Sequence, residues 1–245
     1  MDRLIYSSLS AMKAAMARQA TTANNLANVN TSGFRAEMTS SQALYMKGDG
    51  FGARAPTSEE VVSADMTAGT VAESGRQLDV AVQGTAMLAV QSKDGDEAYT
   101  RRGDLQVSDS GLLTTGDGMP VLGDGGPITL PPAEKVIIAG DGTISIIPLG
   151  GDGQAQQVDR LKLVQANDTG IAKGLDGLFR VRTGGTLPAD PDATVRQGAL
   201  EGSNVNTSGT LIDMIQASRD WDMQVKMMST AQDLDKSTTA LMQIE

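Results

Sequence analysis

The placement of glycine and proline constrains the fold of this 245-residue chain more than any other feature. Of its 28 glycines, 26 lie between Gly48 and Gly202, and all eight prolines lie between Pro56 and Pro191. Residues 1–32 and 210–245 contain neither. Because both residue types interrupt helices and favour turns, the two ends are predicted to be helical and the middle to consist of strands and turns.

Apolar residues in both end segments recur every three or four residues, as on one face of a helix. In the N-terminal segment the stripe is Ile5, Leu9, Met12, Met16, Ala23 and Leu26, with Gln19 at the position between Met16 and Ala23. In the C-terminal segment it is Leu211, Ile215, Ser218, Trp221, Val225 and Met228. Seven alanines from Ala11 to Ala27 favour helix and leave room for a close neighbour. Thr210 and Asp213 have the spacing of a capping box, which predicts Thr210 as the N-cap of the second helix.

The two end segments carry opposite charge. Residues 1–35 contain four basic residues and one acidic residue, whereas residues 201–245 contain seven acidic and three basic residues. A stripe at helical spacing is most often the core face of a helix. The charges add two further alternatives, which both stay open: the segments pair with each other, or with like segments of neighbouring subunits. Exposed ion pairs contribute about 0–1 kcal/mol each, so charge would select the partner more than set the strength.

The middle of the chain has the pattern of antiparallel strands. Leu78, Val80 and Val82 alternate with less apolar residues, and turn signals such as Asp117-Gly118 separate the runs. The predicted fold class is therefore α+β, with terminal helices pairing as a coiled-coil-like arm domain and a central all-β, sandwich-like or barrel-like domain. The expected boundaries are 1–35 plus 204–245 for the arms, 36–75 for an extended connector and 76–203 for the β domain.

A hexapeptide, NVNTSG, occurs at residues 28–33 and again at residues 204–209. Its Asn, Thr and Ser side chains suit the ends of helices, where they bond backbone groups that lack a partner within the helix. The composition alone is explained by capping, but the identity of the two copies is not. Both copies are therefore predicted to lie where the helical segments meet the middle of the chain.

The composition argues against catalysis. With no histidine and no cysteine, the chain cannot form a Ser-His-Asp triad, a Cys-His pair or a thiolate nucleophile. The Asp-Gly clusters lack the spacing of a calcium loop, and Gly48–Gly52 lacks the Lys-Ser/Thr of a phosphate loop. A net charge of −10 disfavours nucleic acid and anionic membranes as partners. No catalytic residue, cofactor or metal site is predicted, and neither a secretory signal nor a membrane span is recognised.

The sequence NNLANVNTSGFR at residues 24–35 closely resembles the N-terminal signature of the bacterial flagellar axial proteins of the rod and hook. The resemblance continues in LDVAVQG (78–84), YTRRG (99–103), DGTI (141–144), QGALE (197–201) and SNV (203–205), and covers nearly the whole chain. The first residues and the length are more similar to the proximal-rod members than to the distal-rod or hook members. Residues 85–88 depart from the family pattern, which usually has a glycine and two phenylalanines there, so altered packing is expected rather than a different fold.

The resemblance implies a structural axial subunit of the flagellar proximal rod, which assembles helically and transmits torque across the periplasm. It implies export from the cytoplasm by the flagellar type III apparatus without a cleaved signal peptide. The implied partners are other rod subunits, copies of the chain itself and the export apparatus, with peptidoglycan nearby, and include neither nucleic acid nor a membrane. The alternatives are a distal-rod or hook-type subunit, an enzyme acting on peptidoglycan and a carbohydrate-binding β module.

The predicted assembly interface lies in the two end segments. Asn24 and Asn28, one helical turn apart, either bond neighbouring backbone or face solvent. The interface comprises Ile5, Leu9, Met12, Met16, Asn24, Asn25, Leu26, Asn28, Leu211, Ile215, Trp221, Val225 and Met228.

Overall fold

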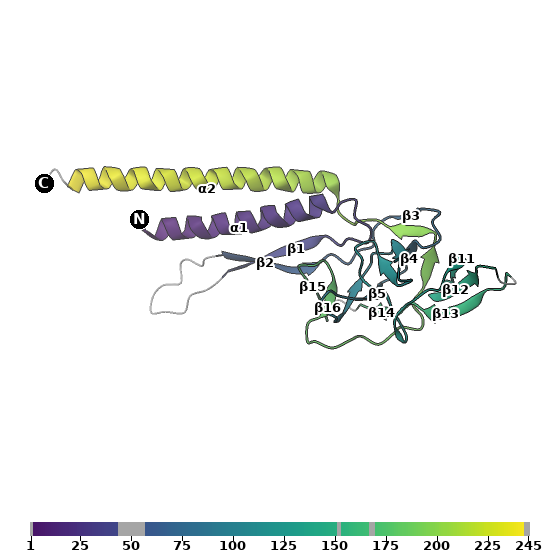
Figure 1. Cartoon of the computed structure of the whole chain (residues 1–245). Coiled ribbons are helices and arrows are strands. Elements are labelled where there is room, and N and C mark those ends of the chain that lie inside the picture. Colours follow the sequence, from purple (N-terminus) through teal and green to yellow (C-terminus); the bar gives the residue numbers. More distant parts are fainter. Residues whose placement is uncertain (1, 44–56, 151–152, 167–169, 243–245) are drawn as a thin grey trace. The chain divides into compact units, whose positions relative to one another are not determined.

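The computed structural model describes residues 2–43, 57–150, 153–166 and 170–242, with the side chains of 2–7, 41–43, 57–62 and 240–242 left out (Figure 1). Contacts divide the chain into two compact units. The helical unit contains Met1–Ala27, Glu37–Ser63 and Asn206–Glu245, and the β unit contains Asn28–Ala36 and Ala64–Val205. The Gly48–Gly52 segment lies outside the described residues.

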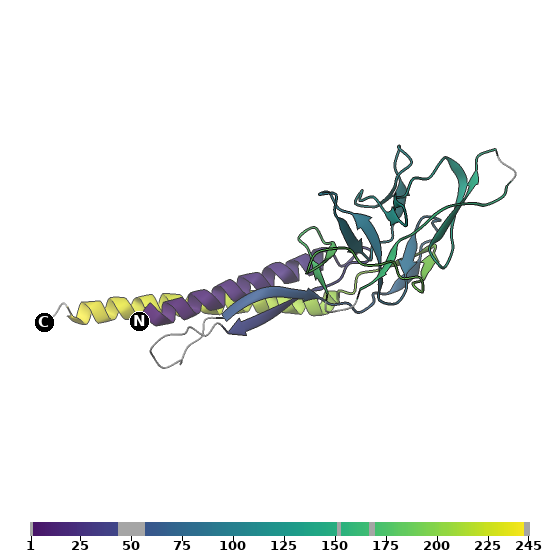
Figure 2. The same ribbon diagram turned by 90° about the horizontal axis from the view of Figure 1, so that it is seen from below.

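The helical unit contains the two helices that the absence of glycine and proline predicts. Helix α1 spans Asp2–Ala27 and helix α2 spans Thr207–Met242. The two helices lie side by side and antiparallel, and the C-terminal end of α2 projects beyond the N-terminal end of α1 (Figures 1 and 2). Strands β1 (Glu37–Ala43) and β2 (Thr57–Ala64) pair with each other, and β1 also contacts α1. Residues 36–75, expected to form an extended connector, thus include a pair of strands.

The β unit is built from short antiparallel strands. Its largest sheet has the order β14-β5-β6-β16-β15, a second sheet has the order β11-β12-β13, and four pairs complete it: β17-β4, β18-β3, β7-β8 and β10-β9. The first strands are β3 (Val71–Glu73), β4 (Val80–Val82), β5 (Ala86–Gln91), β6 (Glu97–Thr100), β7 (Leu105–Val107), β8 (Leu113–Thr115), β9 (Leu122–Gly123) and β10 (Gly126–Pro127). The later strands are β11 (Ala133–Ile138), β12 (Thr143–Pro148), β13 (Gln156–Arg160), β14 (Leu163–Gln165), β15 (Ile171–Lys173), β16 (Phe179–Val181), β17 (Val195–Gln197) and β18 (Ala199–Glu201).

Strand β5 separates two apolar cores. Its alternate side chains Leu88 and Val90 belong to the larger core, which also contains residues of β4, β7, β8, β12 and β14. Met87 and Ala89 point to the other face and pack with Tyr99 in the smaller core. Successive side chains of a strand face opposite sides, so a strand buried on both faces needs apolar residues at every position. Of residues 85–88, which depart from the family pattern, Ala86, Met87 and Leu88 therefore still lie in a buried strand, whereas Thr85 is exposed before it.

The two copies of the hexapeptide adopt different conformations. The first forms turns directly after α1, and its Gly33 has a φ of +65°. In the second, residues 207–209 form the first turn of α2, and Asn206 is the N-cap: its Oδ1 accepts a hydrogen bond from Gly209 N at 3.1 Å. The helix thus begins earlier than the capping box predicted. The Thr210 hydroxyl instead donates to the Asn206 carbonyl at 2.8 Å.

The α+β class and the antiparallel centre are confirmed, and both copies of the hexapeptide lie at helix ends as predicted. Among the described residues, neither helix is apolar enough over a sufficient length to cross a membrane.

Candidate functional site

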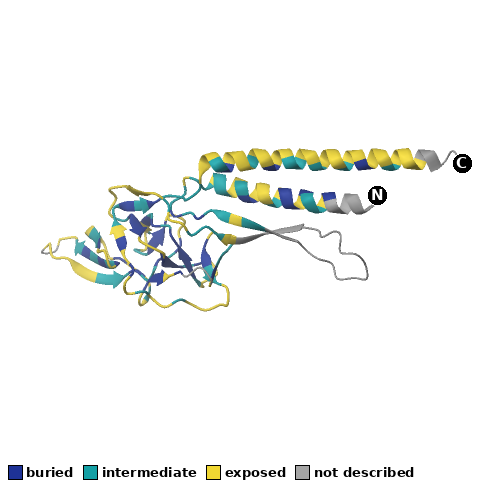
Figure 3. Ribbon diagram, turned by 180° about the vertical axis from the view of Figure 1, so that it is seen from behind, coloured by how far each residue is buried: buried dark blue, intermediate teal, exposed yellow. Residues whose placement is uncertain are grey.

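One face of α2 is covered by α1. The buried and half-buried positions of α2 recur at alternating steps of four and three residues, and several carry small or polar side chains. Figure 3 shows them as a line along a helix that is otherwise exposed. The positions that follow these steps are Thr210, Met214, Ala217, Trp221, Gln224, Met228, Ala231 and Asp235, and the adjacent Gly209 and Asp220 are also half-buried.

Helix α1 is buried over a wider face, because it contacts both α2 and β1. Its buried side chains are small apart from one methionine, so its neighbours approach closely. The buried residues of α1 are Ser8, Met12, Ala14, Ala15 and Thr21. Leu9 and Met16 lie outside this face, with exposed fractions of 42% and 55%.

The predicted interface residues therefore divide into three groups. Met12 is buried, and Leu26, Trp221 and Met228 are half-buried. Leu9, Met16, Leu211, Ile215 and Val225 are exposed. Ile5 lies in α1, but its side chain is outside the described residues.

The stripe read from the sequence of α2 is thus not the face that meets α1, except at Trp221 and Met228. The covered face instead contains Thr210, Met214 and Ala217. Each of them lies one residue before a residue of the predicted stripe. The buried positions of this face, Thr210, Ala217 and Ala231, carry small side chains, whereas the larger Met214, Trp221 and Met228 are half-buried. Whether the predicted residues form contacts between subunits stays a prediction.

Large apolar side chains gather on the exposed surface of α2. The described exposed members are Leu211, Ile212, Ile215, Met223, Val225, Met227 and Leu234. Single exposed apolar residues are ordinary, whereas a series of them along one long helix is typical of surfaces that bind another molecule.

The asparagines near the end of α1 form local contacts. Asn25 pairs with the backbone of Glu37: its Nδ2 donates to Glu37 O at 3.0 Å, and its Oδ1 accepts from Glu37 N at 2.8 Å. This arrangement imitates a step of a β ladder and fixes the start of β1 beside the last turn of α1. Asn28 Oδ1 accepts a hydrogen bond from the Thr31 hydroxyl at 3.1 Å, whereas Asn24 is exposed.

A buried charge cluster holds together four segments of the β unit. The Glu201 carboxylate lies between two guanidinium groups, with Oε1 2.6 Å from Arg35 Nη2 and Oε2 2.6 Å from Arg101 Nη2. Gly69 N also donates to Oε1 at 2.9 Å, and Gly33 N donates to the Glu201 carbonyl at 2.8 Å. All three charged side chains are 1–3% exposed. We call Arg35, Arg101 and Glu201 the charge hub.

Arg101 uses its whole guanidinium group in this cluster. Its Nε donates to Glu201 at 2.8 Å, and its Nη atoms donate to the carbonyls of Val82, Gly84 and Ala86. Burial lowers the pKa of Arg101 from its usual value, while the attraction of Glu201 opposes that shift. A buried charge is tolerated when it is paired and hydrogen-bonded, and Arg101 meets both conditions. Arg35 is paired through Nη2, but its Nε and Nη1 are buried without a hydrogen-bond partner.

Asn204, in the second hexapeptide copy, connects two further segments of the β unit. Its Oδ1 accepts a hydrogen bond from Ala36 N at 2.8 Å, and its Nδ2 donates to the carbonyls of Asp65 and Thr67 at 2.9 and 3.0 Å. Together with the charge hub, Asn204 fixes the segments that directly follow α1 and precede α2 in the sequence.

Three family profiles match the chain. "Flagella basal body rod protein" matches residues 5–35, "Flagellar hook protein FlgE/F/G D1 domain" matches residues 81–146, and "Flagellar basal body rod FlgEFG protein C-terminal" matches residues 196–241. The flagellar basal-body rod protein FlgF of Escherichia coli (strain K12) is 41% identical over 240 residues, which cover 95% of each chain. FlgF of Caulobacter vibrioides is 33% identical over 244 residues, or 97% of this chain and 96% of the other. FlgG of Bacillus subtilis (strain 168) is 29% identical over 258 residues, or 96% and 97%.

The chain belongs to the flagellar basal-body rod protein family. It is most like the FlgF members, and it is a structural subunit of the proximal rod. The prediction that it is not an enzyme is confirmed, because the rod proteins to which it is similar are structural. Its place is the flagellar basal body, where rod proteins assemble with one another.

No pattern in the sequence predicts the charge hub of this rod protein. Arg35, Arg101 and Glu201 each stand in a segment that resembles the family, but a charged residue in a loop or at a strand end is usually solvated. Asn204 belongs to the repeated hexapeptide, which can be recognised in the sequence. The repeat predicts only that both copies have related surroundings, and it does not identify the hydrogen-bond partners of Asn204. The pairing partners, up to 168 residues apart, become visible only in the structure.

Proposed function

We propose that this rod protein enters the proximal rod by packing the exposed face of α2 against helices of neighbouring subunits, whether copies of itself or other rod proteins. The observation that carries the proposal is the series of large apolar side chains on that face, from Leu211 to Leu234. Full burial of such a side chain is worth about 1.5–3 kcal/mol, and these are already partly covered, so each would add about 1 kcal/mol on assembly.

The α1–α2 pair is proposed to be coiled-coil-like. Its support is the alternation of three- and four-residue steps on the inner face of α2, which is the spacing of a coiled-coil seam. In that arrangement the inner face binds α1 of the same chain, and the outer face remains for a neighbour. Leu9 and Met16 on the outside of α1 extend the available apolar surface.

The contact between subunits is proposed to be heterologous, so that successive subunits form a helical array rather than a closed dimer. Such an array transmits torque across the periplasm because each subunit is held by several neighbours. Export by the flagellar type III apparatus without a cleaved signal peptide, and passage close to peptidoglycan, belong to the same proposal and follow from the family resemblance.

The test places two charges on the outer face of α2. In cells lacking their own copy of the rod protein, the Ile215→Asp/Met223→Asp double variant is expected to be absent from purified hook–basal bodies and to give no swarming. The matched control, Gln216→Asp/Ser229→Asp, adds the same charge to the same helix at exposed polar positions. It is expected to enter the rod.

Both variants should keep the circular dichroism spectrum and melting temperature of the parent, because exposed substitutions usually change stability by less than about 0.5 kcal/mol. Incorporation of the double variant at the level of the control would refute the proposal.

A further inference from the structure

All the sulfur of this chain is in methionine. The chain has 13 methionines and no cysteine, so thioether groups are its only sulfur atoms open to oxidation. A two-electron oxidant such as hydrogen peroxide converts an accessible thioether into a sulfoxide, and methionine sulfoxide reductases restore it. Access of the oxidant to each side chain therefore decides which methionines react.

The exposed methionines that the structure describes all lie in the helical unit. Met16 of α1 and Met38 of β1 are exposed, and Met223 and Met227 of α2 are 58% and 48% exposed. In the described part of the β unit, by contrast, the methionines are buried or half-buried. An oxidant in solution therefore reaches the helical unit first.

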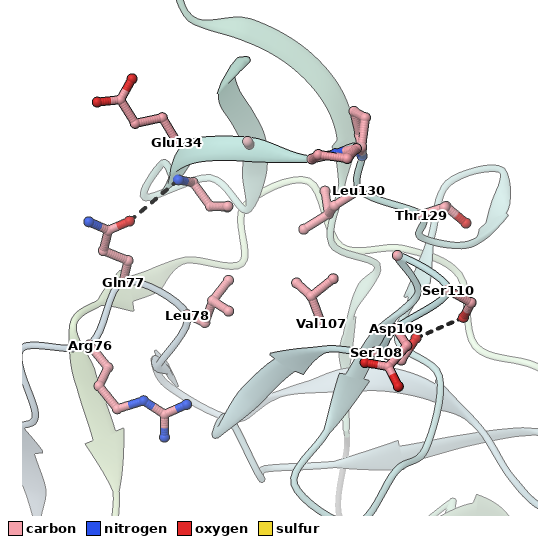
Figure 4. Close-up of a pocket in the computed structure, with 15 residues that line it drawn as sticks. Arg76, Gln77, Leu78, Val107, Ser108, Asp109, Ser110, Thr129, Leu130 and Glu134 are labelled. Atoms are coloured by element: carbon pink, nitrogen blue, oxygen red, sulfur yellow. Dashed lines mark hydrogen bonds between the residues drawn. The ribbon is translucent and has the colours of Figure 1, made fainter. Parts of the chain in front are cut away.

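The one large opening in the described part of the β unit does not change this. It is a pocket of about 750 Å³, which a molecule as small as hydrogen peroxide can enter. Figure 4 shows Leu78, Val107 and Leu130 pointing into the space from different walls. The described residues that line the pocket include no methionine, so an oxidant inside it meets no thioether.

The methionines of α2 whose side chains the structure describes divide between two faces. Met214 and Met228 belong to the half-buried positions that α1 covers. Met223 and Met227 belong to the exposed apolar series instead, and we call them the outer methionine pair. They stand four residues apart, so they are neighbours on one side of the helix. Oxidation of the folded subunit therefore falls on the outer face of α2.

Oxidation makes this surface polar. The sulfur of Met223 attacks one oxygen of hydrogen peroxide, the O–O bond breaks, an S=O bond forms and water leaves. The sulfur is oxidised by two electrons and the peroxide is reduced by two. The new oxygen accepts hydrogen bonds from water in the free subunit, but it would lack a donor if an apolar neighbour covered it. The fold tolerates the change, whereas a contact across this face does not.

We propose that the outer methionine pair is an oxidation site of the unassembled subunit, and that its conversion to sulfoxides by peroxide excludes the folded subunit from the rod. This inference rests on the proposed function, because it requires that neighbours cover the outer face of α2. The same contact shields both sulfurs after assembly. The site is therefore sensitive before assembly and protected after it.

Peptide mass spectrometry tests the reactivity of the pair. Purified full-length protein is treated with hydrogen peroxide, and sulfoxide formation is followed at each methionine. The outer methionine pair is expected to react about tenfold faster than Met12 and Met87, which are buried. The circular dichroism spectrum should stay unchanged meanwhile. Equal rates at the exposed and buried positions would overturn the proposal.

A competition inside one cell tests the effect on assembly. Parent and Met223→Leu/Met227→Leu subunits with different tags are made together in cells lacking their own copy. A peroxide pulse is given that is strong enough to form both sulfoxides in the unassembled parent. Leucine has a similar volume and cannot be oxidised in this way. The pulse is expected to raise the ratio of variant to parent in purified hook–basal bodies at least about threefold. Dividing by the ratio without the pulse removes any difference in basal entry.

The matched control is Met38→Leu, which removes an exposed methionine of the helical unit outside α2. Its ratio to the parent should not change with the pulse. An unchanged ratio for the double variant, or an equal rise for Met38→Leu, would overturn the proposal.

The oxidation site and the proposed function fail in different ways. Exclusion of the Ile215→Asp/Met223→Asp variant from the rod, together with a ratio that ignores the pulse, would refute the oxidation site and leave the proposed function intact. Entry of that variant at the level of its control, together with a ratio that rises with the pulse, would do the reverse.

Discussion

The β unit and the helical unit differ in how completely they cover their own apolar and charged groups. In the β unit, strand β5 is buried on both faces, and the charge hub pairs its buried charges within the chain. In the helical unit, Ala14, Ala15, Ala217 and Ala231 are buried, while a series of large apolar residues of α2, from Leu211 to Leu234, is exposed. The β unit has two apolar cores of its own, whereas the helical unit leaves large apolar side chains exposed for a contact with another molecule.

The largest effect that would test this contrast comes from Glu201→Gln. The change leaves Arg35 and Arg101 buried without a counter-charge, which typically costs about 3–5 kcal/mol. Urea unfolding followed by far-ultraviolet circular dichroism should show this loss. Glu134→Gln, at an exposed glutamate of the same unit, is the control and should change little. Equal stability of both variants would mean that the β unit does not depend on the charge hub.

The two hexapeptide copies allow the same substitution to be made in both units. A Cβ on Gly33 would lie 2.3 Å from backbone atoms of Arg101, at a φ of +65°. Left-handed strain and overpacking together cost about 2–5 kcal/mol. At Gly209, in the first turn of α2, the nearest atom is 3.6 Å away, so alanine is expected to be neutral or to stabilise by up to about 1 kcal/mol. Melting temperatures of Gly33→Ala and Gly209→Ala should therefore move apart, and a shift of both in the same direction would contradict the structure.

A smaller effect is expected at alkaline pH in the β unit. Tyr99 is buried, with its hydroxyl donating to Glu97 at 2.9 Å and accepting from Leu187 N at 2.6 Å. Burial raises the pKa of Tyr99 from 10.0 to about 12. The unfolded chain therefore loses the Tyr99 proton at a lower pH than the folded chain. The contribution of Tyr99 to the free energy of unfolding is present in full below about pH 10, and it falls by about 2–3 kcal/mol as the pH rises towards 12.

The measurement compares the parent with Tyr99→Phe by urea unfolding at several pH values. The difference between their free energies of unfolding should change between pH 10 and 12. Trp221, the single tryptophan, lies on α2 and reports on the helical unit, so its fluorescence transition should not show this difference. A difference that is constant with pH would show that Tyr99 titrates normally.

The sequence predicted the elements better than their contacts. The absence of glycine and proline located both helices, and the alternation around Val80 located buried strands. Most of the apolar stripe of α2 is not the face that meets α1, because periodicity reports where apolar residues recur, whereas the face that meets α1 includes the buried Ala217 and Ala231. Strand β1 carries mostly polar residues, so its pairing with β2 left no apolar alternation to recognise. The domain boundaries and the interface between subunits remain predictions.

The charge hub also sets an order of events during folding. Arg35 and Glu201 are 166 positions apart, and Arg101 lies between them. Closing so long a loop is slow and entropically costly. The ion pairs that stabilise the closed loop form only when the Glu201 carboxylate reaches the two arginines. A chain growing from its N-terminus therefore carries two unneutralised guanidinium groups until residue 201 is available. The charge hub therefore forms late in folding. Any fragment that ends before Glu201 should fail to fold the β unit fully.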